Sequence, residues 1–146
     1  MSTPVINLQA VFLNGSSLEV PDRARFNGLT GDVPISININ ASNRQLSDEL
    51  YEVSVRVTLE SKHEGKDLYV AELTQVGIFT IQAEKTLLGQ ILYKACPSVI
   101  LPYLRSNLAD LLLRAQLPIM HLPDVNWVDP NEQNAVQNPD IPKLVH

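Results

Sequence analysis

Apolar and polar residues alternate along the first half of the chain, which is the pattern of half-buried β-strands. The alternation is clearest in residues 35–42, where isoleucines and an alanine are separated by serines and asparagines. It returns in residues 53–60, where valines and a leucine are opposed by polar residues. Residues 62–67, which include Gly65, have the composition of a hairpin turn. We therefore predict two strands here, and expect the second to pair antiparallel with the strand that follows the turn.

The first and fourth predicted strands are less regular. From Ile6 to about Val20 apolar residues alternate at first, and Asn14-Gly15 then predicts an interruption by a turn or bulge. Residues 68–81 are apolar in both phases of the alternation, so both faces of this strand need cover. Residues 21–34 have the composition of a loop, and they carry three apolar residues, Phe26, Leu29 and Val33.

Beyond Glu84 the apolar spacing changes to that of an amphipathic helix, which continues to about Leu117. Pro97 suits the first turn of a helix, whereas Pro102 lacks the amide that would bond the carbonyl of Ser98. We therefore expect a break near Cys96-Pro97 and a bend just after it. The apolar stripe is wider than a helix on one sheet needs, and a second subunit is the simplest cover for the excess residues, Tyr93, Val99, Ile100 and Tyr103.

The chain after the helix is predicted to be irregular. Residues 118–123 form an apolar connector to the only tryptophan, Trp127, and the prolines beyond it argue against a long terminal helix. We assign residues 1–127 to one α+β domain, in which a four-stranded antiparallel sheet packs on a long C-terminal helix. Residues 128–146 are expected to be an irregular, proline-containing tail.

Composition narrows the class of partner. With 11 Lys and Arg against 16 Asp and Glu, the net charge of −5 argues against binding to nucleic acid or to a membrane surface by electrostatics. Only 18% of the residues are charged while 45% are hydrophobic, which favours self-association. A single cysteine and an N-terminal segment without a signal-peptide pattern indicate a cytoplasmic protein. Runs free of charge stop short of the ~20 apolar residues of a membrane span, so no membrane insertion is expected.

Few residues are suited to catalysis. His63 is expected in the solvated hairpin turn and His121 in the connector, while Cys96 is expected to be a small buried residue rather than a nucleophile. The sequence has no Gly-rich phosphate loop and no nucleophile elbow. We therefore expect no enzyme, cofactor or metal site. A small-molecule enzyme or carrier that depends on His121 or Cys96 is the distant alternative.

One motif identifies a family resemblance. Residues 96–107 read CPSVILPYLRSN, and a helix interior seldom tolerates two prolines at this spacing. Together with several shorter segments, this motif resembles the bacterial SecB family of protein-export chaperones over roughly residues 6–127. The shorter segments are Tyr51-Glu52-Val53, Val76-Gly77-Ile78-Phe79, Arg114, Pro118, His121-Leu122 and Val125-Asn126-Trp127.

The resemblance implies a function and a set of sites. It implies a homotetramer, built as a dimer of dimers, that holds preproteins unfolded in the cytoplasm without ATP and delivers them to the SecA motor. It places SecA binding on the acidic outer face of the sheet, at Glu19, Val70 and Glu72. It also implies client binding at Leu29, Val33, Ile35 and Ile37, although core packing is the stronger expectation for the last two. Tetramer contacts are expected from Tyr93 and its helix neighbours Val99 and Ile100.

The chain also departs from the family pattern. Gly15 stands where the family commonly has an acid on the motor-binding face, and Leu101 replaces a usual phenylalanine. The tail after Trp127 differs most, because the family continues into a terminal helix that covers part of the client surface. Within the same scaffold, SecB-like chaperones of antitoxins in toxin–antitoxin systems are the alternative function.

Overall fold

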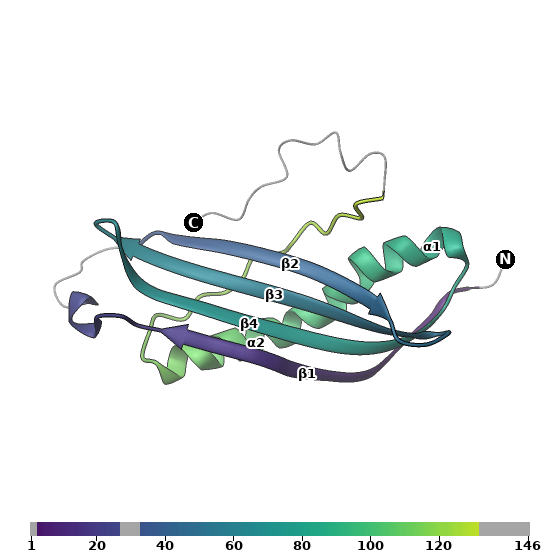
Figure 1. Ribbon diagram of the computed structural model, residues 1–146, viewed down its shortest axis with the longest axis horizontal. Helices are drawn as coiled ribbons and strands as arrows, with labels where there is room; N and C mark the ends of the chain where they lie inside the picture. Colours follow the sequence, from purple (N-terminus) through teal and green to yellow (C-terminus); the bar gives the residue numbers. More distant parts are fainter. Residues whose placement is uncertain (1–2, 27–32, 132–146) are drawn as a thin grey trace.

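The computed structural model describes residues 3–26 and 33–131, and shows a four-stranded sheet with a long helical run across one face (Figure 1). The helical elements are the 3-10 helix η1 (Arg23–Phe26), α1 (Lys85–Gln90), the π-helix η2 (Ile91–Ala95) and α2 (Cys96–Arg114). The predicted fold class, an antiparallel sheet packed on a long helix, is confirmed. The strands are β1 (Val5–Glu19), β2 (Ile35–Gln45), β3 (Leu50–His63) and β4 (Lys66–Gln82).

All neighbouring strands are antiparallel, and their order across the sheet is β1-β4-β3-β2. β3 and β4 form the predicted hairpin, which closes at Glu64 and Gly65. Both turn residues have positive φ, 53° at Glu64 and 76° at Gly65. This left-handed backbone conformation matches the twist of the two strands that a two-residue turn joins. In this strand order β1, although first in the sequence, forms one edge of the sheet and pairs with the last strand, β4.

β1 runs without a break, so the interruption predicted at Asn14-Gly15 is a bulge inside the strand. The register with β4 shifts between Leu8 and Ala10, and again between Leu13 and Gly15. A shift of this kind adds a residue to one strand and moves the following side chains to the opposite face. Apolar residues of β1 therefore lie on both faces. Leu8 packs against the core, whereas Phe12 is 42% exposed.

α1, η2 and α2 follow one another directly and make one helical run from Lys85 to Arg114. In place of the break expected near Cys96-Pro97, the helix changes there from π to α geometry and continues. Pro97 lies in the first turn of α2, and Pro102 is accommodated inside it. Loss of one amide donor at Pro102 is outweighed by the buried leucines that hold both sides of this position against the sheet.

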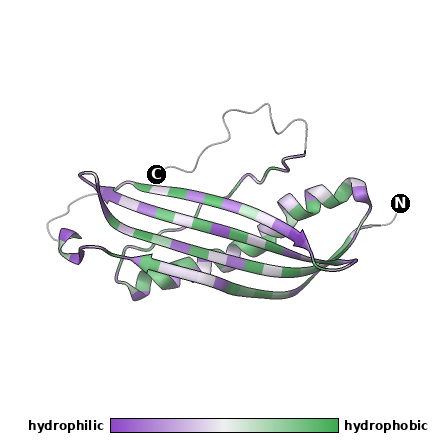
Figure 2. Ribbon diagram, viewed as in Figure 1, coloured by the Kyte–Doolittle hydropathy of each residue, from purple (hydrophilic) through white to green (hydrophobic). Residues whose placement is uncertain are grey.

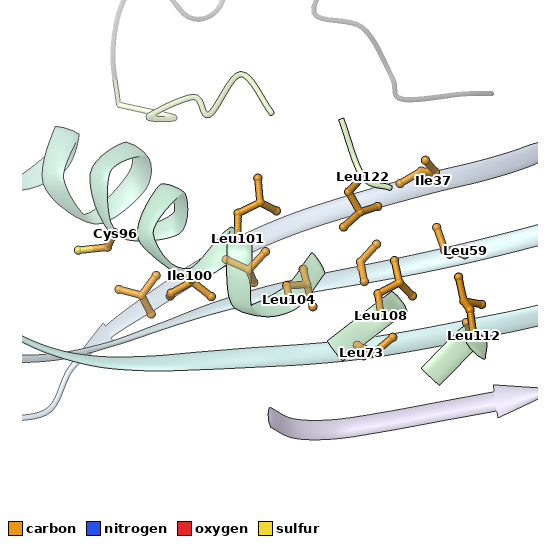
Figure 3. Packing of buried hydrophobic residues seen from close by; sticks show 14 of the residues in the cluster. Ile37, Leu59, Leu73, Cys96, Ile100, Leu101, Leu104, Leu108, Leu112 and Leu122 are labelled. Carbon is orange, nitrogen blue, oxygen red and sulfur yellow. The ribbon is translucent and has the colours of Figure 1, made fainter. Parts of the chain in front are cut away.

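The core lies between α2 and the inner face of the sheet. Ile100, Leu104, Leu108 and Leu112 recur every four residues along α2 and are fully buried (Figure 3). On the sheet they meet alternate residues of β3 and β4, and Figure 2 shows the corresponding bands of apolar and polar residues along the strands. Each fully buried leucine contributes roughly 1.5–3 kcal/mol. The helical run is long and apolar enough to cross a membrane, but this packing is that of a core helix.

Residues 117–131 return beside the helical run as an irregular connector (Figure 1). Arg105 of α2 holds its middle, because Nε donates to the Leu122 carbonyl and Nη2 to Asp124 Oδ1, both at 2.9 Å. At its far end Asp129 is only 5% exposed and lies so close to α1 that a Cβ on Gly89 would be 2.5 Å from its Oδ2. Packing against the helical run thus continues to Asp129, while the division into a domain of residues 1–127 and a tail of residues 128–146 stays a prediction. The prediction of no terminal helix falls on residues 132–146, outside the described part.

Candidate functional site

Every second residue of β3 and β4 points away from α2 and belongs to the outer face of the sheet. The register places Glu19 of β1 directly opposite Val70 of β4, and Glu72 follows two residues along β4 on the same face. Glu19 is exposed, while Val70 and Glu72 are half-buried. The fold thus brings together the three residues at which the resemblance implies SecA binding, although Glu19 lies more than 50 positions before the other two in the sequence.

A fourth residue joins this group. Glu60 of β3 lies opposite Val70 on the side away from Glu19, so two carboxylates flank the valine. Directly opposed residues of antiparallel strands have Cβ atoms about 5 Å apart. We call Glu19, Glu60, Val70 and Glu72 the acidic patch. Glu60 is not among the residues that the resemblance indicates, but its outward phase in β3 and the hairpin register together would have located it.

Two arginines on the outer face are each paired with a carboxylate. Arg56 of β3 makes an ion pair with Glu72 across the diagonal of the β3–β4 ladder. Arg44 of β2 donates from Nε and Nη2 to the two carboxylate oxygens of Glu52, at 3.0 and 3.2 Å. These hydrogen bonds with Glu52 raise the pKa of Arg44. Glu72, the charge that interrupts the apolar phase of β4, is therefore stabilised by a neighbouring cation.

Gly15 lies on the same face, opposite Thr74 of β4. An added Cβ at Gly15 would meet nothing within 4 Å. Its backbone does not require glycine, because its φ lies outside the left-handed region. Neither the backbone conformation nor the surrounding space therefore prevents an acidic side chain at this position.

Beside the acidic patch the outer face becomes apolar. Phe12 of β1 lies opposite Val76 of β4, and Ala10 lies opposite Ile78. Phe12 is 42% exposed and Ile78 is half-buried. β4 is thus apolar on both faces, as its sequence predicts, and α2 covers the other face. We call these four residues the apolar strip.

The expected client-binding residues differ in exposure. Ile37 lies opposite Leu59 and is only 6% exposed, so it is a core residue beneath α2. Ile35 and Ile37 share the inward phase of β2, but Ile37 is more deeply buried and is therefore a packing residue. Val33 and Ile35 are half-buried at the margin of the same core. Leu29 lies outside the described residues. Val33 and Ile35 therefore retain accessible surface.

The expected oligomer contacts also fall into different environments. Ile100 is fully buried, and its side-chain atoms lie 3.1 Å from the Cβ that Gly77 lacks, so it belongs to the core of its own chain. Tyr93 is half-buried and lines a cavity together with Asp129. Val99 is 42% exposed and points away from the sheet. The outward face of α2 comprises Val99, Tyr103 and Leu113, the last two being 43% and 59% exposed.

The residues considered for catalysis are not arranged as a catalytic site. Burial raises the pKa of the Cys96 thiol to about 12, so the thiol stays protonated and is a poor nucleophile. His63 lies in the exposed hairpin turn 3.7 Å from Glu64, and His121 is exposed in the connector. Among residues 3–26 and 33–131, no group of three or more His, Cys, Asp or Glu is placed to hold a metal ion.

These features define an α+β scaffold, with one sheet face packed on a helix and the other carrying an acidic patch and an apolar strip. The profile of the SecB family, described as preprotein translocase subunit SecB, matches residues 1–138. The chain belongs to the SecB family, a family of protein-export chaperones and not of enzymes, which confirms the resemblance noted from the sequence.

Two curated relatives illustrate the similarity. The protein-export protein SecB of Bordetella pertussis strain Tohama I is 38% identical over 145 residues, which cover 94% of this chain and 81% of the relative. The protein-export protein SecB of Polaromonas sp. strain JS666 is 33% identical over 135 residues, which cover 92% of this chain and 90% of the relative.

Solved structures show the same fold. A SecB-like chaperone of Mycobacterium tuberculosis, in complex with a peptide from an antitoxin, matches with a TM-score of 0.63 at 13% identity, covering 83% of this chain and 88% of that one. A protein of unknown function from Streptococcus agalactiae matches with a TM-score of 0.54 at 10% identity, covering 84% and 100%. At these identities the likeness concerns the fold alone.

Proposed function

We propose that this SecB-type chaperone binds unfolded preproteins in the cytoplasm without ATP and delivers them to the SecA motor. The observation that carries the proposal is the strand register, which gathers Glu19, Val70 and Glu72 on a sheet face that its own helix leaves uncovered. An acidic surface steers a partner with a basic segment, because a potential of one sign raises the rate of encounter. The acidic patch is therefore the docking surface for SecA in this proposal.

Client holding rests on apolar surface that remains accessible. Each Å² of apolar surface removed from water contributes ~25 cal/mol, so many modest contacts hold an extended chain without reading its sequence. Val33 and Ile35 are the described residues that we assign to this contact. A client that folds quickly buries its own apolar side chains and is released. A client that folds slowly stays bound, because binding to its unfolded state lowers the population that can fold. No nucleotide is needed for such holding.

Assembly into a homotetramer would use the outward face of α2. Val99, Tyr103 and Leu113 leave 42%, 43% and 59% of their surface exposed on one chain. Three large apolar residues on one helix face are the usual sign of a contact with another polypeptide. We assign this face to the subunit interface, in place of the buried Ile100.

The first experiment combines native mass spectrometry with an aggregation assay. We expect a species near four times 16.2 kDa that suppresses the aggregation of an unfolded preprotein in the absence of nucleotide. Val99→Asp should shift the mass toward smaller species, whereas Leu46→Asp should not, because Leu46 is equally exposed (41%) but lies in the β2–β3 turn. A monomeric wild-type chain that leaves aggregation unchanged contradicts the proposal.

The second experiment separates the two binding surfaces. Glu72→Lys should weaken binding to purified SecA at least tenfold while leaving client capture intact. Val33→Ser should do the reverse, with Leu46→Ser as the control for loss of an exposed apolar side chain. If Glu72→Lys binds SecA as the wild type does, the acidic patch is not the docking surface.

A second function within the same fold is the chaperoning of an antitoxin. The observation that favours it is the solved SecB-like chaperone that holds an antitoxin peptide. The two functions differ in genetic context, because a chaperone of this kind is expected beside the toxin and antitoxin genes that it serves. Measuring the half-life of such an antitoxin with and without co-expression of this chaperone distinguishes the two functions. Protection of the antitoxin with no binding to SecA favours the second function.

A further inference from the structure

Arg56, a cation beside the acidic patch, is paired with one of the carboxylates of the patch. Arg56 of β3 makes an ion pair with Glu72 Oε1, although the residue directly opposite Arg56 in the ladder is Thr74. The arginine therefore reaches diagonally toward the patch. The side chain of Glu72 is 31% exposed and that of Arg56 is 58% exposed, so the pair is accessible to a partner at the surface.

We infer that Arg56 sets the affinity and salt sensitivity of SecA docking by occupying Glu72 in the free chaperone. This inference rests on the proposed docking function of the patch. A basic segment that arrives at Glu72 must share or displace the guanidinium, because both cations seek the same carboxylate oxygens. Exposed ion pairs are weak, so exchange is feasible, but the cost of exchange reduces the affinity of the incoming partner.

The geometry gives Arg56 a second effect. Glu19 and Glu60 flank Val70 on either side, and Glu72 lies on the next outward position of β4, so three carboxylates share a small area. Arg56 offsets part of their mutual repulsion and lowers the negative potential that a basic partner experiences. Its removal should therefore speed association as well as free Glu72.

Arg44 provides a matched control on the same sheet face. It is also paired with a carboxylate, Glu52, but Glu52 lies opposite Ile78 near the other end of β4. Six ladder rows at about 3.4 Å each separate it from Glu72, roughly 20 Å and beyond the screening length at physiological salt. Arg44→Met and Arg56→Met make the same change in net charge, and only the second releases Glu72.

The test measures the affinity of the full-length chaperone for purified SecA by titration calorimetry at two salt concentrations. Arg56→Met should bind about two- to fivefold more tightly than the wild type, with a steeper loss of affinity as salt rises. Arg44→Met should remain within about 1.5-fold of the wild type. In a Glu72→Gln background, the Arg56→Met effect should become smaller than in the wild type, because the contested carboxylate is absent and only the contribution through the potential of Glu19 and Glu60 remains.

The outcomes separate this inference from the function on which it rests. A wild-type chain that does not bind SecA overturns both. If the wild type binds and Arg56→Met matches Arg44→Met, or binds more weakly than the wild type, the role of Arg56 is overturned while docking stands. An unchanged native mass for both variants shows that the assembly is intact, as expected for substitutions at exposed side chains.

Discussion

Asn107 of α2 donates a 2.7 Å hydrogen bond from Nδ2 to Oε1 of Gln75 on β4, inside an interface that is otherwise built mainly from apolar residues. Gln75 is only 2% exposed. A buried amide that loses its hydrogen-bond partner costs free energy, so this bond favours the one rotation of α2 about its axis that brings Asn107 over Gln75. The pair therefore specifies how α2 lies, while the leucines supply most of the stabilisation.

Asn107→Ala should lower the free energy of unfolding by about 1–3 kcal/mol, because it leaves the Gln75 oxygen buried without this donor. Replacing both residues by leucine should recover much of the loss, since neither side then carries an unpaired amide. Urea unfolding at one fixed protein concentration measures both variants. A single substitution as stable as the wild type would show that water satisfies Gln75.

Gly77→Ala should destabilise the helix–sheet interface by about 1–3 kcal/mol. The new methyl would lie 2.8 Å from Cε2 of Phe79 and 3.1 Å from Cδ1 of Ile100, both in the core. Gly15→Ala is the control, because a Cβ there has open space and should change stability by less than about 1 kcal/mol. Thermal unfolding of the two variants compares them directly, and equal melting temperatures would contradict the tight packing at Gly77.

Gly15→Asp should strengthen SecA docking by a few fold, since it adds a carboxylate to the outer face next to the acidic patch and the backbone has room for it. Gly15→Asn, which has almost the same shape without the charge, should bind as the wild type does. Affinity measured at low and high salt checks the comparison. An equal gain in both variants would point to the backbone and not to charge.

The Cys96 thiol should resist modification in the folded protein, because burial raises its pKa to about 12. Labelling with a disulfide reagent at pH 8 should be at least tenfold slower in buffer than in urea. Above pH ~9 the unfolded chain loses the thiol proton while the folded chain keeps it, so stability should decline as the pH rises from ~9 toward 12. Cys96→Ser should show a smaller decline. Buried Tyr69 also has a raised pKa, but it is present in both proteins and cancels in the comparison.

The alternation of apolar residues was sufficient to predict the strands, because only one phase of β2 and β3 is apolar and the buried face is then fixed. It was not sufficient for β1, where two bulges change the phase after Leu8 and after Leu13. Bulges depend on pairing with β4, which lies far away in the sequence. The helix break was also mispredicted, since proline chemistry is local while the leucine stripe that carries α2 through Pro102 acts through the sheet.

In the candidate site, too, the sequence located some residues, while others depend on contacts between distant strands. Family resemblance indicated Glu19, Val70 and Glu72, and the register gathers them. Glu60 and Arg56 enter only through cross-strand pairing, which a single strand does not reveal. Exposure separated residues that the sequence treated alike: Ile37 and Ile100 are buried, whereas Ile35 and Val99 keep accessible surface. How deeply each of these apolar residues is buried depends on what packs over it as well as on the period of the pattern.

The strand order has a consequence for biosynthesis. β1 pairs with β4, and Val5 meets Gln82, so the first strand made lacks its complete partner strand until more than 60 residues beyond Glu19 have been translated. At roughly 5–20 residues per second, this delay lasts about 3–13 s. During that time an alternating apolar segment is free near the ribosome, where it can aggregate. The nascent chaperone thus faces, for several seconds, the hazard from which it is proposed to protect other proteins.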